Sequence, residues 1–207
     1  MRPSAVLLQL VLVTVLVAGY IWLGRHAFAG SRFVFAVLLV LLLLWSHRQR
    51  GDSMRGIGFR LDTARRTAMF LVPVAVLSIA ITLAVGYAGH SLDFPAPPVT
   101  LGTFAKLLLF GLAQQYVLLG FYHRGIATLV PSPAGAILLT ALVFAAFHIP
   151  NPFLVIVTFL AALVAAAIYR RSPNLWVTGV THGLISFFLY YSLPFSLTGG
   201  LRVGPEY

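Results

Sequence analysis

The chain contains no cysteine and only four acidic residues among its 207 residues. Without cysteine, disulfide bonds, zinc–thiolate sites and thiol nucleophiles are excluded. Charged residues make up 9% of the chain and hydrophobic residues 60%, and the mean hydropathy is +0.97. A soluble domain of this length has no interior large enough to bury so many apolar side chains, so a lipid bilayer must accommodate them. We therefore expect an integral membrane protein.

Apolar runs of about the length that crosses a bilayer, near 20 residues, occur seven times. They predict an all-α, polytopic transmembrane helix bundle of about seven spans, at residues 4–24, 32–46, 67–89, 101–122, 134–149, 151–169 and 174–194. The first run is longer than the apolar region of a signal peptide, and no clear cleavage site follows it, so we expect it to be retained. Proline at positions 150 and 152 predicts a tight hairpin between the fifth and sixth spans, with its tip inside the membrane.

Basic residues distribute unevenly over the loops, which predicts the orientation of the chain. With seven spans, one side holds ten of them and the other holds Arg25, Arg32, Lys106 and Arg202. Because loops rich in arginine and lysine stay in the cytoplasm, we expect a cytoplasmic N-terminus and an outside C-terminus, in a bacterial inner (plasma) membrane. The net charge of +10 is typical of such loops, so we expect membrane lipids as partners and no nucleic acid.

The basic loop 47–66 has two interpretations that the sequence leaves open. Its arginines could contact anionic headgroups while Ile57, Phe59 and Leu61 enter the membrane surface. Alternatively, the loop is a solvated connector that only determines orientation.

Four polar side chains interrupt the apolar spans and mark a candidate site. Gln114 and Gln115 lie deep in the fourth span, His148 ends the fifth, and His182 lies in the seventh with Ser186 one turn further on. Polar groups at this depth face a bundle interior or a wet cavity rather than lipid. Simple hydrogen bonding between helices is the alternative for each one. Four such groups on three spans favour a shared polar cavity.

Metal and cofactor binding are not expected from this set of residues. With no cysteine and no carboxylate in any span, two histidines fall below the three ligands of a catalytic zinc site. The chain also shows no glycine-rich nucleotide loop. We therefore predict no metal and no cofactor.

The order and spacing of these groups resemble the CPBP family of intramembrane proteases, which includes the CAAX prenyl endopeptidases of the Rce type and bacterial Abi proteins. The family carries Glu-Glu-x-x-x-Arg, then Phe-x-x-x-His, then His-x-x-x-Asn or Asp two spans later. Here residues 114–120 read Gln-Gln-Tyr-Val-Leu-Leu-Gly, residues 144–148 read Phe-Ala-Ala-Phe-His, and residues 182–186 read His-Gly-Leu-Ile-Ser. The resemblance covers about residues 101–195. It predicts a CPBP-like core at 101–207, after about three N-terminal spans at 1–100.

The resemblance implies that a family glutamate activates water for attack on a peptide bond, while histidine and asparagine stabilise the oxyanion. In this chain Gln114 and Gln115 stand at the glutamate positions, and an amide cannot accept that proton near neutral pH. Leu119 replaces the arginine, and Ser186 replaces the asparagine. The loss of the carboxylates is consistent with the loss of the arginine, because a buried arginine without carboxylate partners would be an unpaired charge.

The sequence leaves three functions open. The first is an intramembrane endopeptidase of the CAAX type, independent of metal, in which a histidine acts as general base. The second is a catalytically silent relative that binds or assembles with a membrane-embedded or lipidated protein or peptide. The third is a small transporter, which ranks last because the chain shows no inverted repeat.

Overall fold

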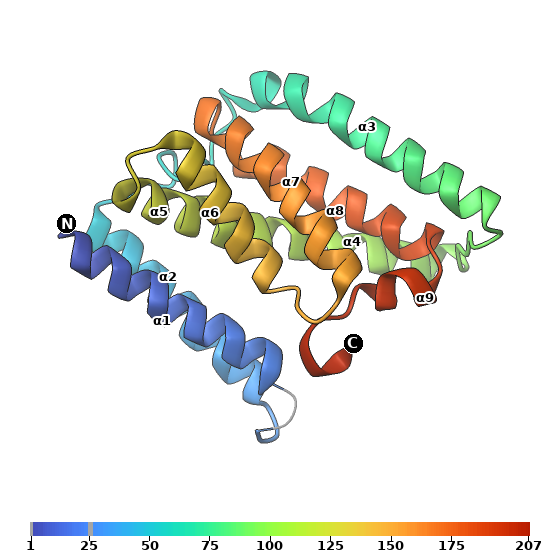
Figure 1. Cartoon of the computed structure of the whole chain (residues 1–207), viewed down its shortest axis with the longest axis horizontal. Coiled ribbons are helices and arrows are strands. Elements are labelled where there is room, and N and C mark those ends of the chain that lie inside the picture. Colours follow the sequence, from blue (N-terminus) through green and yellow to red (C-terminus); the bar gives the residue numbers. More distant parts are fainter. Residues whose placement is uncertain (1, 25–26) are drawn as a thin grey trace.

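The computed structural model describes residues 2–24 and 27–207, and in these ranges it contains helices and turns but no strand. Met1, His26 and Arg25, one of the basic residues predicted for the outer side, lie outside the described residues. The long helices run side by side in one bundle (Figure 1). The helices are α1 (Pro3–Trp22), α2 (Ser31–Arg50), α3 (Ala64–Ala88), α4 (Pro97–Gln115), α5 (Arg124–Leu129), α6 (Pro133–Ala146), α7 (Pro152–Arg171), α8 (Leu175–Ser192) and α9 (Phe195–Thr198).

Five helical stretches are long and apolar enough to cross a membrane, which confirms the prediction of an all-α polytopic bundle. They are Pro3–Trp22, Ser31–Arg50, Ala64–Ala88, Pro97–Leu129 and Pro152–Arg171. The two other predicted spans also form helices, but α6 has only 14 residues and α8 interrupts its apolar residues with Thr178, Thr181 and His182. The count of seven spans therefore remains a prediction.

Large apolar side chains cover the outside of the bundle. Val15, Leu77 and Leu109 are among many that stay exposed along the helices. Soluble monomers rarely expose apolar patches of more than a few hundred Å². This surface is suited to contact with hydrocarbon.

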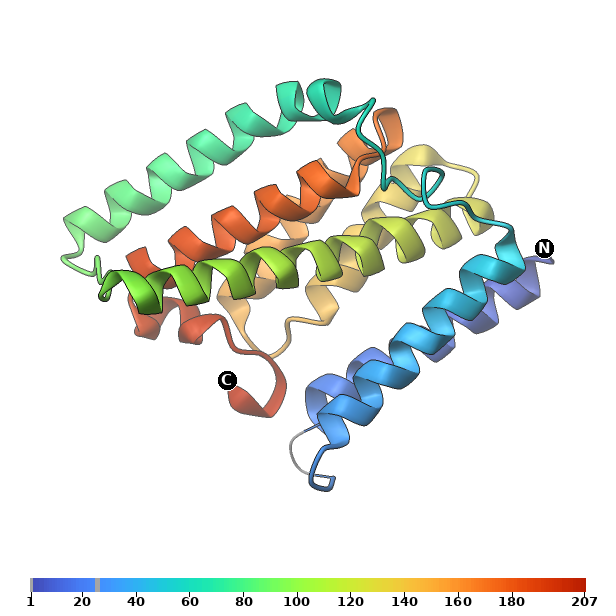
Figure 2. The ribbon, with the colours of Figure 1, turned by 180° about the vertical axis from the view of Figure 1, so that it is seen from behind.

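Glycine residues bring α4 and α8 into close contact. Figure 2 shows α4 in front with α8 alongside it, and this is the most extensive helix pair in the structure. A Cβ atom at Gly111 would lie 2.6 Å from the backbone nitrogen of Gly183 and 2.7 Å from the carbonyl oxygen of Gly179. Small residues let membrane helices approach until their backbones touch. This contact determines the spacing between Gln115, one turn after Gly111, and His182.

A π-helix, η1 (Tyr116–His123), joins α4 to α5 without a break. Such segments are rare and occur frequently at functional sites. Within it, Leu119 is completely buried in an apolar cluster with Ala141, Ala162 and Leu175. The position at which the family has arginine therefore has apolar surroundings in this protein.

Helix α6, which leads into the turn before α7, is shorter than predicted. The fifth span was expected to reach residue 149, but α6 ends at Ala146 and residues 147–151 form a turn, because a residue before proline disfavours helical backbone. The 14 residues of α6 rise by about 21 Å, less than the roughly 30 Å of a hydrocarbon core. This favours a turn that stays within the membrane.

The C-terminal residues supply hydrogen-bond partners to this turn. The side chain of Asn151 donates to the carbonyl oxygens of Thr198 at 2.8 Å and Arg202 at 3.1 Å. The backbone nitrogen of Gly204 donates to the carbonyl oxygen of Ile149 at 3.0 Å. Irregular backbone at membrane depth is tolerated only where the protein itself satisfies it.

The basic loop is shorter than predicted and packs on the bundle. Residues 47–50 complete α2 and residues 64–66 begin α3, so the connection spans 51–63. Ile57 is only 2% exposed, and Phe59 contacts the rings of Tyr116 and Trp176. Protein therefore covers Ile57, while Phe59 is half-buried. Contact of the loop with lipid headgroups stays a prediction. Leu61 is 77% exposed.

Hydrogen bonds also hold this loop, so it is more than a solvated connector. The hydroxyl of Tyr169 donates to the carbonyl oxygen of Ile57 at 2.7 Å, and the backbone nitrogen of Leu175 donates to that of Gly58 at 2.8 Å. Gly58 has φ +103°, a backbone conformation that residues other than glycine rarely adopt. A Cβ atom there would lie 3.1 Å from side-chain atoms of Leu175 and Tyr169. Helix α3 packs along α8, and α1 packs along α5. The predicted division of the chain into N-terminal spans at 1–100 and a core at 101–207 stays a prediction.

Candidate functional site

Gln115 and His182 form a hydrogen bond between α4 and α8. The amide Nε2 of Gln115 lies 3.2 Å from Nδ1 of His182, and the glutamine is 3% exposed. An amide nitrogen can only donate, so Nδ1 accepts and the imidazole proton lies on Nε2. His182 thus presents an N–H donor on its other side.

The carbonyl oxygen of the Gln115 side chain is buried and unpaired. Among the described residues, no donor lies within hydrogen-bond distance of Oε1. A buried acceptor without a partner costs about 1–3 kcal/mol. A ligand that offers an N–H group here would remove that cost once the groups that cover Oε1 move aside.

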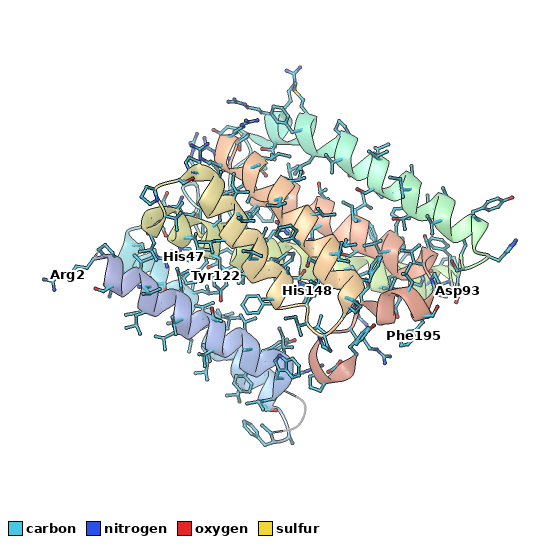
Figure 3. The ribbon with its side chains drawn as sticks, in the orientation of Figure 1. Arg2, His47, Asp93, Tyr122, His148 and Phe195 are labelled. Carbon is cyan, nitrogen blue, oxygen red and sulfur yellow. The ribbon has the colours of Figure 1, made fainter. Side chains whose placement is uncertain are left out.

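One phenyl ring connects the two histidines. The ring of Phe144 lies 4.7 Å from that of His148 and 6.0 Å from that of His182, measured between centroids, with edge-on geometry in both cases. Nδ1 of His148 donates to the carbonyl oxygen of Phe144 at 2.6 Å, so its Nε2 keeps a free lone pair. Figure 3 shows His148 between the helices in the middle of the view, away from Arg2 at one side and Asp93 at the other.

The structure brings three of the five predicted site residues into one connected group and leaves two outside it. Gln115, His182 and His148 are connected through the Gln115–His182 hydrogen bond and through Phe144. Gln114 and Ser186 are half-buried, and within residues 2–24 and 27–207 neither side chain forms a hydrogen bond. One turn before His182 on α8, the hydroxyl of Thr178 donates to the carbonyl oxygen of Asn174 at 2.9 Å.

The chemistry of the connected group is that of uncharged hydrogen-bonding partners. It offers one amide, two imidazoles and no carboxylate. In the part of the chain that the structure describes, no three histidine or acidic side chains gather into a metal-binding group. The group can orient a peptide bond or a water molecule, but a carboxylate to accept a proton is lacking.

A second polar cluster, which the sequence did not reveal, lies where α2 ends and α5 begins. Nδ1 of His47 donates to the carboxylate of Asp52 at 2.9 Å, and Arg124 pairs with the same carboxylate. Arg124 also donates to the carbonyl oxygen of Gly56 at 2.8 Å. Asp52, an acidic residue at the start of a basic loop, was the one signal for it.

Asp52 is the centre of this cluster, and its side chain is only 7% exposed. Burial raises the pKa of the Asp52 carboxyl, but hydrogen bonds from His47 and Arg124 outweigh this effect and hold the pKa below its ordinary value. A carboxyl whose pKa is lower in the folded state stabilises the fold above its unfolded pKa. That stabilisation disappears as the pH falls through the folded pKa.

The Asp52→Asn variant should therefore lose about 2 kcal/mol of unfolding free energy near neutral pH, since hydrogen bonds to charged groups carry roughly that much. The difference from wild type should begin to shrink as the pH falls below about 4, where the carboxyl of the unfolded chain becomes protonated, and should disappear as the pH falls through the lower pKa of the folded state. Thermal unfolding in detergent across this pH range measures both effects. Asp93→Asn, at an exposed carboxylate, is the matched control, and equal losses in both variants would contradict the role of Asp52.

Apolar helices around an uncharged polar group define an integral membrane protein with a candidate site in its interior. The family model described as "Type II CAAX prenyl endopeptidase Rce1-like" matches residues 4–188. The chain therefore belongs to this family, which confirms the resemblance and extends it from the last four spans to the N-terminal helices. Searches of curated proteins and of solved structures found no match.

Proposed function

We propose that this protein binds a membrane-embedded or lipidated peptide at the Gln115–His182 pair and does not hydrolyse it. It would do so in a bacterial plasma membrane, with a cytoplasmic N-terminus and an outside C-terminus, as the basic loops favour. The observation that carries the proposal is the buried Gln115 amide, which donates to His182 while its own carbonyl oxygen has no partner among the described residues.

The hydrogen-bonding groups of this site are suited to the recognition of a peptide. The Oε1 atom of Gln115 can accept from a peptide N–H, and Nε2 of His182 can donate to a peptide carbonyl. The exposed apolar side chains of the bundle can pack against a lipid tail or a peptide helix. Binding therefore requires no charge on the ligand.

Hydrolysis lacks its usual proton acceptor in this site. A carboxamide has no basic form near neutral pH, so neither Gln114 nor Gln115 can take a proton from water. The apolar surroundings of Leu119 fit this interpretation, because an arginine there would be a buried charge without a carboxylate partner. The differences from the family motif at positions 114, 115 and 119 are therefore consistent with one another and with a loss of hydrolysis.

Binding of a fluorescent prenylated peptide that ends in a CAAX sequence tests the proposal. In nanodiscs, the wild-type protein should bind it saturably, and Gln115→Leu should weaken binding about tenfold or more, because two hydrogen-bonding groups are lost at similar volume. Gln49→Leu, at an exposed glutamine, should leave the affinity unchanged. Absence of saturable binding, or equal effects of the two variants, would overturn the proposal.

A second candidate function is hydrolysis with His148 as general base. The hydrogen bond from Nδ1 to the carbonyl oxygen of Phe144 orients this imidazole and leaves Nε2 free to accept a proton. In this case the wild-type protein would cleave the same peptide. His148→Ala and His182→Ala would each abolish cleavage.

A further inference from the structure

A cavity of about 480 Å³ lies at the end of the bundle where α1 begins and where α2 and α7 end. The charged and polar side chains that line it include Arg50, Asp52, His123, Arg124, Tyr169 and Arg170. None of Gln114, Gln115, His148 and His182 contributes to its lining. The cavity is therefore separate from the site proposed to bind peptide.

The lining of this cavity carries excess positive charge. It combines three arginines with one carboxylate, and both His47 and Arg124 already contact that carboxylate. One negative charge cannot balance three guanidinium groups.

Arg50 is held rigidly at the wall of the cavity. Its Nε donates to the side-chain oxygen of Gln9 at 2.9 Å, and its guanidinium lies 4.5 Å from the ring centroid of Phe121. Contacts on both sides fix its orientation before any ligand binds, which lowers the entropic cost of binding.

Two donors of this wall have no acceptor. Nη2 of Arg50 and Nε of Arg124 are buried, and neither has a hydrogen-bond partner among the described residues. Both belong to guanidinium groups that line the cavity. Guanidinium groups match the oxygens of a phosphate in geometry as well as in charge.

We propose that this cavity binds a phosphate group, carried either by an anionic phospholipid headgroup or by a free phosphate compound. The volume lies within the roughly 300–1,000 Å³ of small-molecule sites. Basic pockets between membrane helices commonly bind phosphorylated headgroups at such helix ends. The proposal does not depend on what the Gln115–His182 pair binds.

Thermal unfolding in non-ionic detergent tests this proposal and distinguishes the two sources. Inorganic phosphate at millimolar concentration, against sodium chloride of equal ionic strength, should raise the melting temperature saturably if a free phosphate binds. Phosphatidylglycerol alone, against phosphatidylcholine, should raise it if a lipid headgroup binds. Stabilisation by neither probe would overturn the proposal.

Arg170 and Arg171 form a matched pair for assigning the effect to the cavity. Both are exposed at the end of α7, but only Arg170 lines the cavity. With the stabilising probe, Arg170→Gln should raise the apparent Kd about tenfold, because one charge-assisted hydrogen bond is lost, and Arg171→Gln less than about twofold. Equal weakening by both variants would show general charge attraction and overturn the proposal.

Discussion

Replacing Gly111 by alanine should separate α4 from α8 and destabilise the protein by about 2–3 kcal/mol, the upper part of the range for overpacked interiors. The new Cβ would lie 2.6 Å from the backbone nitrogen of Gly183 and 2.7 Å from the oxygen of Gly179. Because both are backbone atoms, no side-chain rotation can relieve the contact. The helices must move, and the 3.2 Å hydrogen bond between Gln115 and His182 should weaken with them.

Gly102→Ala is the matched control for this substitution. Gly102 lies in the same helix, and a Cβ atom there would meet nothing within 4 Å. Alanine should stabilise α4 at that position by about 0.5–1 kcal/mol through its higher helix propensity. Unfolding by heat or denaturing detergent measures both variants. Equal stability of Gly111→Ala and wild type would contradict the close packing of α4 and α8.

Restoring carboxylates at positions 114 and 115 should create peptidase activity. The Gln114→Glu/Gln115→Glu variant would supply a proton acceptor beside His182, and general base catalysis contributes about 10²–10⁴-fold to rates. We expect cleavage of a prenylated CAAX peptide at a rate at least about a hundredfold above that of wild type. A fluorophore and quencher on either side of the scissile bond report the product.

Two controls assign the gained activity to the site. Gln49→Glu adds a carboxylate at an exposed position and should leave the rate at the wild-type level. Adding His182→Ala to the double variant should remove the activity that the carboxylates created. A double variant that binds the peptide but cleaves no faster than wild type would show that the glutamines are not what prevents hydrolysis.

Much of the fold follows from hydrophobic runs, because each helix must present apolar residues to the membrane. Each predicted span corresponds to a helix, with ends shifted by a few residues. The largest shift is at the fourth span, where the continuous helix begins at Pro97 and runs to Leu129. At α6, prolines 150 and 152 end the helix early. The C-terminal segment that satisfies this turn could not be predicted, since its contacts join residues 149–151 to 198–204, distant in sequence.

The candidate site was predictable to the extent that isolated polar groups in apolar spans are costly. That cost marks Gln115, His148 and His182, which the structure connects. It also marked Gln114 and Ser186, because helical spacing alone cannot tell which side chains reach a neighbouring helix. The cluster at Asp52 was not predicted, because its partner Arg124 is 72 residues away. Charged residues near the ends of apolar spans are also common, so neither residue stands out in the sequence.

Mass spectrometry of a prenylated CAAX peptide, after incubation with an excess of the wild-type protein in nanodiscs, tests most directly whether the protein binds the peptide without hydrolysing it. We predict that the peptide is bound and recovered intact, and that cleavage products form only with Gln114→Glu/Gln115→Glu. Cleavage by the wild-type protein, abolished by His148→Ala, would contradict this function and establish a histidine-based peptidase instead.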